Sequence, residues 1–123
     1  MNKKQPNKGV IRKWVKALRS GKYKQSRGYL MQQYATNKNS HCCLGVLCEL
    51  ALEKGIVTRS KEPLGIFRYD QARYILPVAV AKWAGIEAVP RLSNAGSLTT
   101  LNDRLLYDFN QIADVIEEEW LNN

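Results

Sequence analysis

The sequence feature that most constrains the fold is an apolar stretch over residues 41–52, which holds all three cysteines and the single histidine of the chain. Its apolar residues recur at three- and four-residue spacings, which predicts a buried helix over residues 43–54 that stops at Gly55. Ser40 is expected to cap this helix, and Gly45 within it indicates the close approach of another backbone or of a ligand. The rest of the chain is expected to pack around this helix.

Amphipathic patterns predict the elements that would cover it. Apolar residues at helical spacing indicate one helix over residues 9–20, which stops at Gly21, and another over residues 109–121, which Asp108 caps. A short helix is expected to open at residues 76–77 and to end at Gly85. Strands are expected over residues 28–34, 65–70 and 73–75. The expected connections are a polar turn over residues 37–40, a charged connection over residues 56–64, an irregular link over residues 88–96, a short turn capped by Ser97 or Thr99, and a turn at Asn102 and Asp103.

These elements predict an α+β fold. The chain of 123 residues is expected to form one small domain over residues 9–123, preceded by a flexible basic arm over residues 1–8. Three main helices would surround the buried central helix, together with a small antiparallel sheet. No apolar run approaches the ~20 residues of a membrane span, and no signal-peptide core follows the arm. We therefore expect a cytoplasmic protein that does not bind membranes.

Charge is distributed unevenly along the chain, which has a formal net charge of +8. The first 48 residues contain eleven lysines and arginines and no carboxylate, whereas the remaining residues contain eight cations and eleven carboxylates. We expect this imbalance to produce one coherent basic surface that attracts polyanions or multiply charged small anions. The alternative is a solvated basic segment that only aids solubility.

Two clusters that interleave cations with tyrosines are candidates for holding such an anion. Lysine and arginine bind phosphate groups, and a tyrosine ring can stack on a base. His41 is expected beside the start of the central helix, where anions are favoured. The alternative is that Tyr23 covers a helix end and that the second cluster is a solvated strand face. The predicted ligand-binding residues are Lys22, Tyr23, Lys24, Arg27, His41, Arg68, Tyr69 and Arg73.

Chemistry at the cysteines is the competing interpretation. A zinc site usually needs cysteine pairs separated by two to four residues, whereas Cys42 and Cys43 are adjacent and Cys48 follows five residues later. A cysteine nucleophile needs a base close in space, and His41 is the one histidine that could serve. The pattern favours reduced cysteines that are small core residues, with no metal and no cofactor.

Three consecutive glutamates over residues 117–119 lie at the C-terminal end of the last predicted helix. The helix dipole disfavours negative charge at that end. A basic partner is therefore expected there, either the N-terminal helix or a second subunit of a homo-oligomer.

Four segments resemble a family of small bacteriophage proteins, most of which have no assigned function. The shared pattern is W-x3-L-x-S-G-x-Y and C-C-L-G-V-L-C, and the similar segments are residues 14–25, 41–48, 101–103 and 109–117. Family members often carry a glycine shortly after the Asn-Asp pair, where this chain has Arg104 and Leu105, so the turn there is expected to differ. The resemblance implies an intracellular phage accessory protein, of the kind that inhibits a host pathway or counters a host defence. It assigns no functional residue.

Charge and resemblance together predict a non-catalytic phage accessory protein that acts in the host cytoplasm. It would bind an anionic ligand, a host nucleotide immune signal, and so blunt a defence response. One alternative is direct binding of DNA or RNA through the same basic surface. The other is an enzyme that uses His41 and a nearby cysteine.

Overall fold

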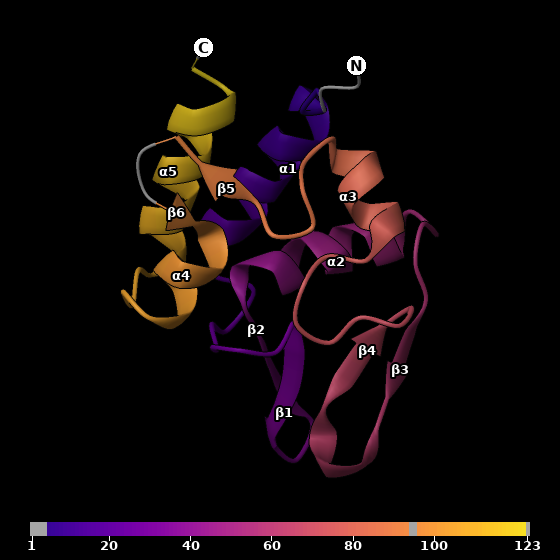
Figure 1. Ribbon diagram of the computed structural model, residues 1–123. Helices are drawn as coiled ribbons and strands as arrows, with labels where there is room; N and C mark the ends of the chain where they lie inside the picture. Colours follow the sequence, from indigo (N-terminus) through magenta and orange to yellow (C-terminus); the bar gives the residue numbers. More distant parts are fainter. Residues whose placement is uncertain (1–4, 94–95, 123) are drawn as a thin grey trace.

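The apolar helix predicted from the sequence lies at the centre of the molecule. In the computed structural model, which describes residues 5–93 and 96–122, this helix is α2 and spans Cys43–Glu53 (Figure 1). Residues 43–48 and Ala51 are buried. Gly55 follows with a left-handed φ of 74°, as expected of the residue that stops a helix. The other helices pack around this element.

Two expectations about the start of α2 have different outcomes. The N-cap is Cys42 and not Ser40, because Lys38–His41 forms strand β2 and the helix begins after that strand ends. The expectation for Gly45 is confirmed, since a Cβ atom at this position would lie 1.7 Å from the carbonyl oxygen of Leu30. A residue without a side chain is needed for two backbones to approach so closely.

Two amphipathic helices lie side by side on one flank of the core. α1 spans Lys8–Arg19 and α5 spans Phe109–Trp120 (Figure 1). Asp108 caps α5 as predicted. Its carboxylate accepts a hydrogen bond from the Gln111 amide, and the Gln111 side chain accepts one from the Asp108 amide. The sequence patterns therefore predict both helices correctly.

Residues 1–4 of the predicted basic arm lie outside the described residues. Gln5 packs against the end of the third helix, because a Cβ atom on Gly85 would lie 1.9 Å from the Gln5 carbonyl oxygen. The Asn7 amide donates a 2.8 Å hydrogen bond to the carbonyl of Ala84, and the Asn7 side chain caps α1. The described part of this segment is thus attached to the domain.

Two shorter helices complete the cover of α2. α3 spans Val78–Ala84 and ends at Gly85, and α4 spans Leu98–Asp103 with Ser97 as its N-cap. The prediction of a turn at Asn102 and Asp103 is wrong, because both residues belong to the last turn of α4. The turn lies directly after α4, at Arg104, and Leu106 further on has a left-handed φ of 57°.

Within the described residues, short strands pair into three separate two-stranded antiparallel sheets. The pairs are β1 (Met31–Ala35) with β2, β3 (Arg59–Lys61) with β4 (Phe67–Tyr69), and β5 (Arg91–Leu92) with β6 (Gly96–Ser97). The β1–β2 and β3–β4 hairpins lie side by side beneath the helices (Figure 1), where Gln32 bridges to Ile66.

The strands differ from the sequence expectations at four places. The expected irregular link over residues 88–96 contains β5 and the first residue of β6. Most of the expected turn over residues 37–40 is strand β2, and the charged connection over residues 56–64 contains β3. Residues 73–75 form no strand, because the Arg73 carbonyl instead accepts a single hydrogen bond from the Leu30 amide. Pairing between distant segments outweighs the weak local preference of polar residues for strands.

The fold is α+β, as predicted. Among the described residues, no helix is both long enough and apolar enough to cross a lipid bilayer.

Candidate functional site

A basic hollow of about 280 Å³ lies between α1 and the C-terminal half of α2. We call it the lysine hollow. It is lined by Lys13, Lys16, Ala17, Ser20, Lys22, Tyr23, Leu50 and Glu53. It therefore combines three cations with one tyrosine and one carboxylate.

Local structure explains why these cations come together. Lys13 and Lys16 are one helical turn apart on the exposed face of α1, opposite the buried stripe that contains Trp14 and Leu18. After α1, Gly21 adopts a left-handed φ of 76° and turns the chain back across the helix end. The Lys22 amide donates a 3.1 Å hydrogen bond to the hydroxyl of Ser20, which stabilises this return.

The cations of the lysine hollow are available to a ligand. Within residues 5–93 and 96–122, no ion pair engages Lys13, Lys16 or Lys22. The Lys22 Nζ lies 5.4 Å from the centroid of the Tyr23 ring. Three ammonium groups against one carboxylate give the lining a net positive charge, which favours an anion. A half-buried tyrosine offers that anion an aromatic surface.

The other predicted ligand-binding cations lie elsewhere. Lys24 projects over the Tyr34 ring of the β1–β2 hairpin at 5.4 Å, and Arg27 is exposed on the loop before β1. Arg68 and Arg73 both pair with Glu62, at 3.6 and 2.6 Å. Both arginines share the single carboxylate of Glu62, so this network keeps a net charge of only +1 and neither arginine is an unpaired anion site.

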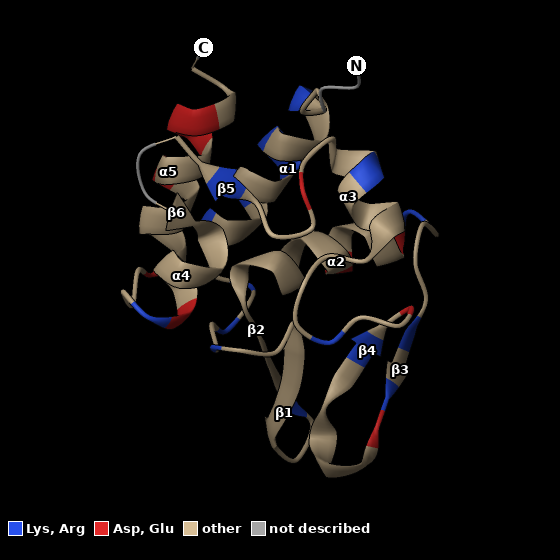
Figure 2. Cartoon of the chain, viewed as in Figure 1, with Lys and Arg blue, Asp and Glu red and all other residues tan. Residues whose placement is uncertain are grey.

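The expected single basic surface is not what the chain forms. Figure 2 shows cationic segments on several elements and carboxylates gathered on the last turns of α5. Arg19 pairs with Asp114 and Glu117 on α5, at 2.6 and 3.1 Å. Through Arg19, the N-terminal helix is therefore the basic partner of Asp114 and Glu117. The lysine hollow collects only part of the N-terminal positive charge.

His41 and Tyr69 belong to a separate, partly buried cluster centred on Glu49. The Glu49 Oε2 accepts hydrogen bonds from the Tyr69 hydroxyl and the Arg59 Nη1, each 2.6 Å long, and it lies 4.0 Å from the His41 Nε2. The ring of Tyr23 meets the His41 ring edge-on, with 5.2 Å between centroids. Tyr23 thus lies between the lysine hollow and the Glu49 cluster.

His41 is neutral in this environment. It is 6% exposed, and neither ring nitrogen has a hydrogen-bond partner among the described residues. Burial lowers the pKa of His41 to about 4, although Glu49 opposes the shift. The carboxylate of Glu49 is already engaged by Tyr69 and Arg59, which limits its effect. None of the described hollows has His41 in its lining.

The cysteines are core residues. All three are buried and unbridged, and burial raises the pKa of Cys42 to about 12 and raises the pKa values of Cys43 and Cys48 as well. A thiolate is the nucleophile and the metal ligand, so these environments disfavour both kinds of chemistry. Among the described residues, no group of histidine, cysteine and carboxylate side chains could hold a metal ion.

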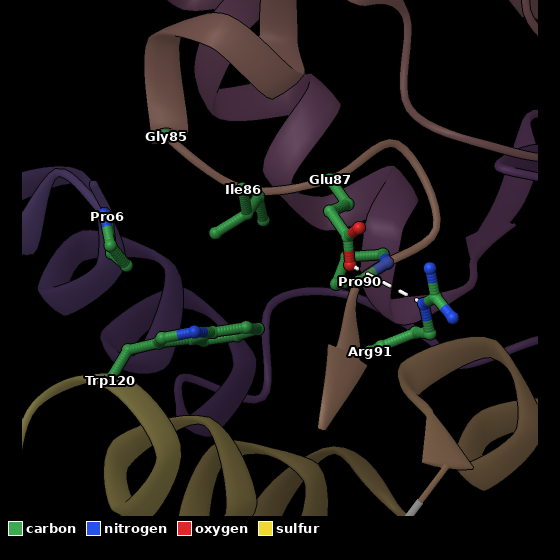
Figure 3. Close-up of a pocket in the computed structure, with 7 residues that line it drawn as sticks. All are labelled: Pro6, Gly85, Ile86, Glu87, Pro90, Arg91 and Trp120. Atoms are coloured by element: carbon green, nitrogen blue, oxygen red, sulfur yellow. Dashed lines mark ion pairs between the residues drawn. The ribbon is translucent and has the colours of Figure 1, made fainter. Parts of the chain in front are cut away.

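A second hollow, of about 450 Å³, lies at the opposite end of α1 (Figure 3). The Trp120 ring faces Ile86 and Pro90 across it, and Glu87 pairs with Arg91 at 3.8 Å on its rim. Since this arginine already has a carboxylate partner, the hollow is a weaker anion site than the lysine hollow.

A family described as "Domain of unknown function (DUF8296)" matches residues 6–120. The chain belongs to this family. No curated protein and no solved structure matches the chain. The DUF8296 match spans α1 through α5, so it includes every element of the lysine hollow and of the Glu49 cluster.

The sequence predicts two residues of the lysine hollow, Lys22 and Tyr23, but not Lys13 and Lys16 as ligand-binding residues. The sequence signal for Lys13 and Lys16 is their three-residue spacing on the polar face of the predicted helix. Gly21 ends that helix, and the chain then turns back so that Lys22 lies in the same hollow. Glu53 carries no local signal, because it reaches the hollow through the packing of α2 on α1.

Proposed function

We propose that this protein is a non-catalytic binding protein whose lysine hollow takes a small phosphorylated ligand, a nucleotide. The observation that supports this proposal is the convergence of Lys13, Lys16 and Lys22 on one hollow beside Tyr23. Ammonium groups bind phosphate oxygens through charge-assisted hydrogen bonds, and the tyrosine ring can pack against a base.

A small ligand fits this surface better than a long nucleic acid does. Glu53 lines one side of the hollow, and on the other side of α1 the Arg19 guanidinium is paired with Asp114 and Glu117. These carboxylates interrupt the cationic track that a polyanion would follow. A volume of about 280 Å³ is just below the usual range of ligand pockets and suits a small ligand, a mononucleotide or part of a larger nucleotide.

The biological role that we propose follows from the sequence resemblance to bacteriophage proteins. A phage protein that binds a nucleotide in the host cytoplasm without chemistry would lower the free concentration of that nucleotide. Sequestration of a host nucleotide immune signal is the function we propose on that basis.

The test is a thermal-shift and calorimetric titration with inorganic phosphate, mononucleotides and cyclic nucleotides, with duplex DNA as the competitor class. A ligand that binds the folded state alone raises the melting temperature with its concentration. We expect Lys16→Ala and Lys22→Ala each to weaken nucleotide binding by about ten-fold or more, since a charge-assisted hydrogen bond contributes about 1.5–3 kcal/mol.

Lys38→Ala is the matched control, because Lys38 is an exposed lysine on β2 outside the hollow. It should leave nucleotide affinity unchanged. The proposal is wrong if no nucleotide stabilises the protein, or if Lys38→Ala weakens binding as much as Lys16→Ala does. Binding of DNA that falls steeply with salt would instead support the nucleic-acid alternative.

A further inference from the structure

The start of α3 presents an exposed apolar surface. Tyr74, Ile75 and Val78 are 53%, 45% and 76% exposed, although they lie within five consecutive residues. Ile75 and Val78 line a hollow of about 680 Å³, larger than the lysine hollow. Contiguous exposed apolar residues of this kind mark interaction sites more often than single ones do.

Packing explains why this surface faces outward. Leu76 and Val80 are buried in the core, so their neighbours Ile75 and Val78 must lie on the opposite side. Tyr74 stacks on Tyr29, with ring centroids 5.0 Å apart, which extends the apolar surface onto the segment before β1. We call Tyr29, Tyr74, Ile75 and Val78 the α3 patch.

The hollow beside the α3 patch carries one charge of each sign. Asp70 directly follows β4, and Lys82 lies one turn after Val78 on α3. The Asp70 Oδ1 accepts hydrogen bonds from the amide and the hydroxyl of Thr58, at 3.0 and 3.1 Å, which fixes the orientation of the carboxylate. Lys82 is exposed and unpaired within the described residues.

We propose that the α3 patch is the interface of a two-fold symmetric homodimer. In such a dimer both copies use the same surface. If one residue contacts a second residue of the other copy, the second residue of the first copy makes the same contact in return. Val78 and Ile75 of one copy would pack on those of the other, and Lys82 of each copy would pair with Asp70 of the other.

Charge complementarity favours a second copy over a different partner. A surface that carries one cation and one carboxylate, Lys82 and Asp70, can complement its own two-fold image. An acidic or a basic partner would attract one of these two charges and repel the other. The α3 patch shares no residue with the lysine hollow, so this proposal does not depend on the proposed function.

Sedimentation velocity over a wide range of protein concentrations tests the dimer. The wild-type protein should show a reversible monomer–dimer equilibrium. Val78→Asp should raise the dimer dissociation constant about thirty-fold or more, because it buries unpaired carboxylates in the interface. Lys82→Glu should raise it about ten-fold, since each new glutamate then faces an aspartate.

Leu105→Asp is the matched control, because Leu105 is an exposed leucine, 58% accessible, in the loop between α4 and α5. It should leave the dimer dissociation constant unchanged. Circular dichroism and the melting temperature of each variant, measured at low concentration, verify that the monomer folds. A wild-type protein that sediments as a monomer at every concentration overturns the proposal, and so does a dimer that survives Val78→Asp.

Discussion

Gly45 has no room for a side chain, whereas Gly9 has room for one. Both are helical, but a Cβ atom on Gly45 would lie 1.7 Å from the Leu30 carbonyl oxygen, whereas one on Gly9 would meet the Asn7 Oδ1 at an ordinary 3.5 Å. The obstacle at Gly45 is backbone, which cannot rotate away as a side chain can. The segment before β1 therefore depends on this glycine for its position on α2.

We predict that Gly45→Ala lowers the free energy of unfolding by about 3 kcal/mol, because the added methyl group forces two backbones apart. Gly9→Ala should raise it by about 0.5–1 kcal/mol, since alanine is the better helix former and has room. Urea unfolding monitored by circular dichroism measures both changes. A Gly45→Ala protein as stable as the wild type would contradict the close approach of Leu30 to α2.

At the scale of elements, α4 is joined to α2 through one buried amide. The Asn102 Oδ1 accepts hydrogen bonds from the Cys43 amide and the Gln25 Nε2, at 3.2 and 2.8 Å. Its Nδ2 donates to the Ser26 carbonyl and to the Asp103 carboxylate, at 2.9 and 2.7 Å. Asn102 thus satisfies one of the unpaired amides at the start of α2 and connects it to the link after α1.

We expect Asn102→Ala to lower the free energy of unfolding by about 3 kcal/mol, because it leaves the Cys43 amide and the Ser26 carbonyl buried without partners. Hydrogen exchange at the Cys43 amide should become faster. Asn110→Ala is the control, as Asn110 is exposed on α5. Equal stabilities of the two variants would show that the Asn102 network contributes little.

Asn102 also shows why part of this structure is not predictable from sequence. An Asn-Asp pair favours a turn locally, but here long-range hydrogen bonds from Cys43 and Gln25 decide its conformation. The helices α1, α2 and α5 are predictable because their apolar spacing records which face is buried. Strand β2 is not, since its polar residues form a strand only through pairing with β1.

The same distinction applies to the candidate site. Lys22 and Tyr23 are adjacent in sequence, so their association with a basic helix can be predicted. The neutralisation of Arg73 by Glu62 and of Arg19 by Glu117 depends on contacts between segments 11 and 98 residues apart. Charge counts along the chain therefore overestimate the positive charge that remains free on the surface.

At the scale of the whole molecule, His41 couples global stability to pH. Burial lowers its pKa from 6.5 to about 4, so below pH 6.5 the unfolded chain binds a proton that the folded protein does not. The contribution of neutral His41 to the free energy of unfolding is fully present above pH 6.5 and is lost as the pH falls toward 4. Arg73 lowers the pKa of Glu62, and Arg19 lowers the pKa of Glu117. The stability that these ion pairs contribute is lost only when the two carboxylates become protonated, below their ordinary pKa of 4.5.

Because the chain contains one histidine, this linkage can be isolated. The free energy of unfolding should decrease by about 3 kcal/mol between pH 6.5 and pH 4. His41→Gln, which stays neutral at every pH, should remove this slope even if it changes the stability at neutral pH. Urea unfolding at a series of pH values measures the effect. An equally steep loss of stability in His41→Gln over the same pH range would mean that another group takes up the proton, and the neutral His41 beside Glu49 would then not control the acid response.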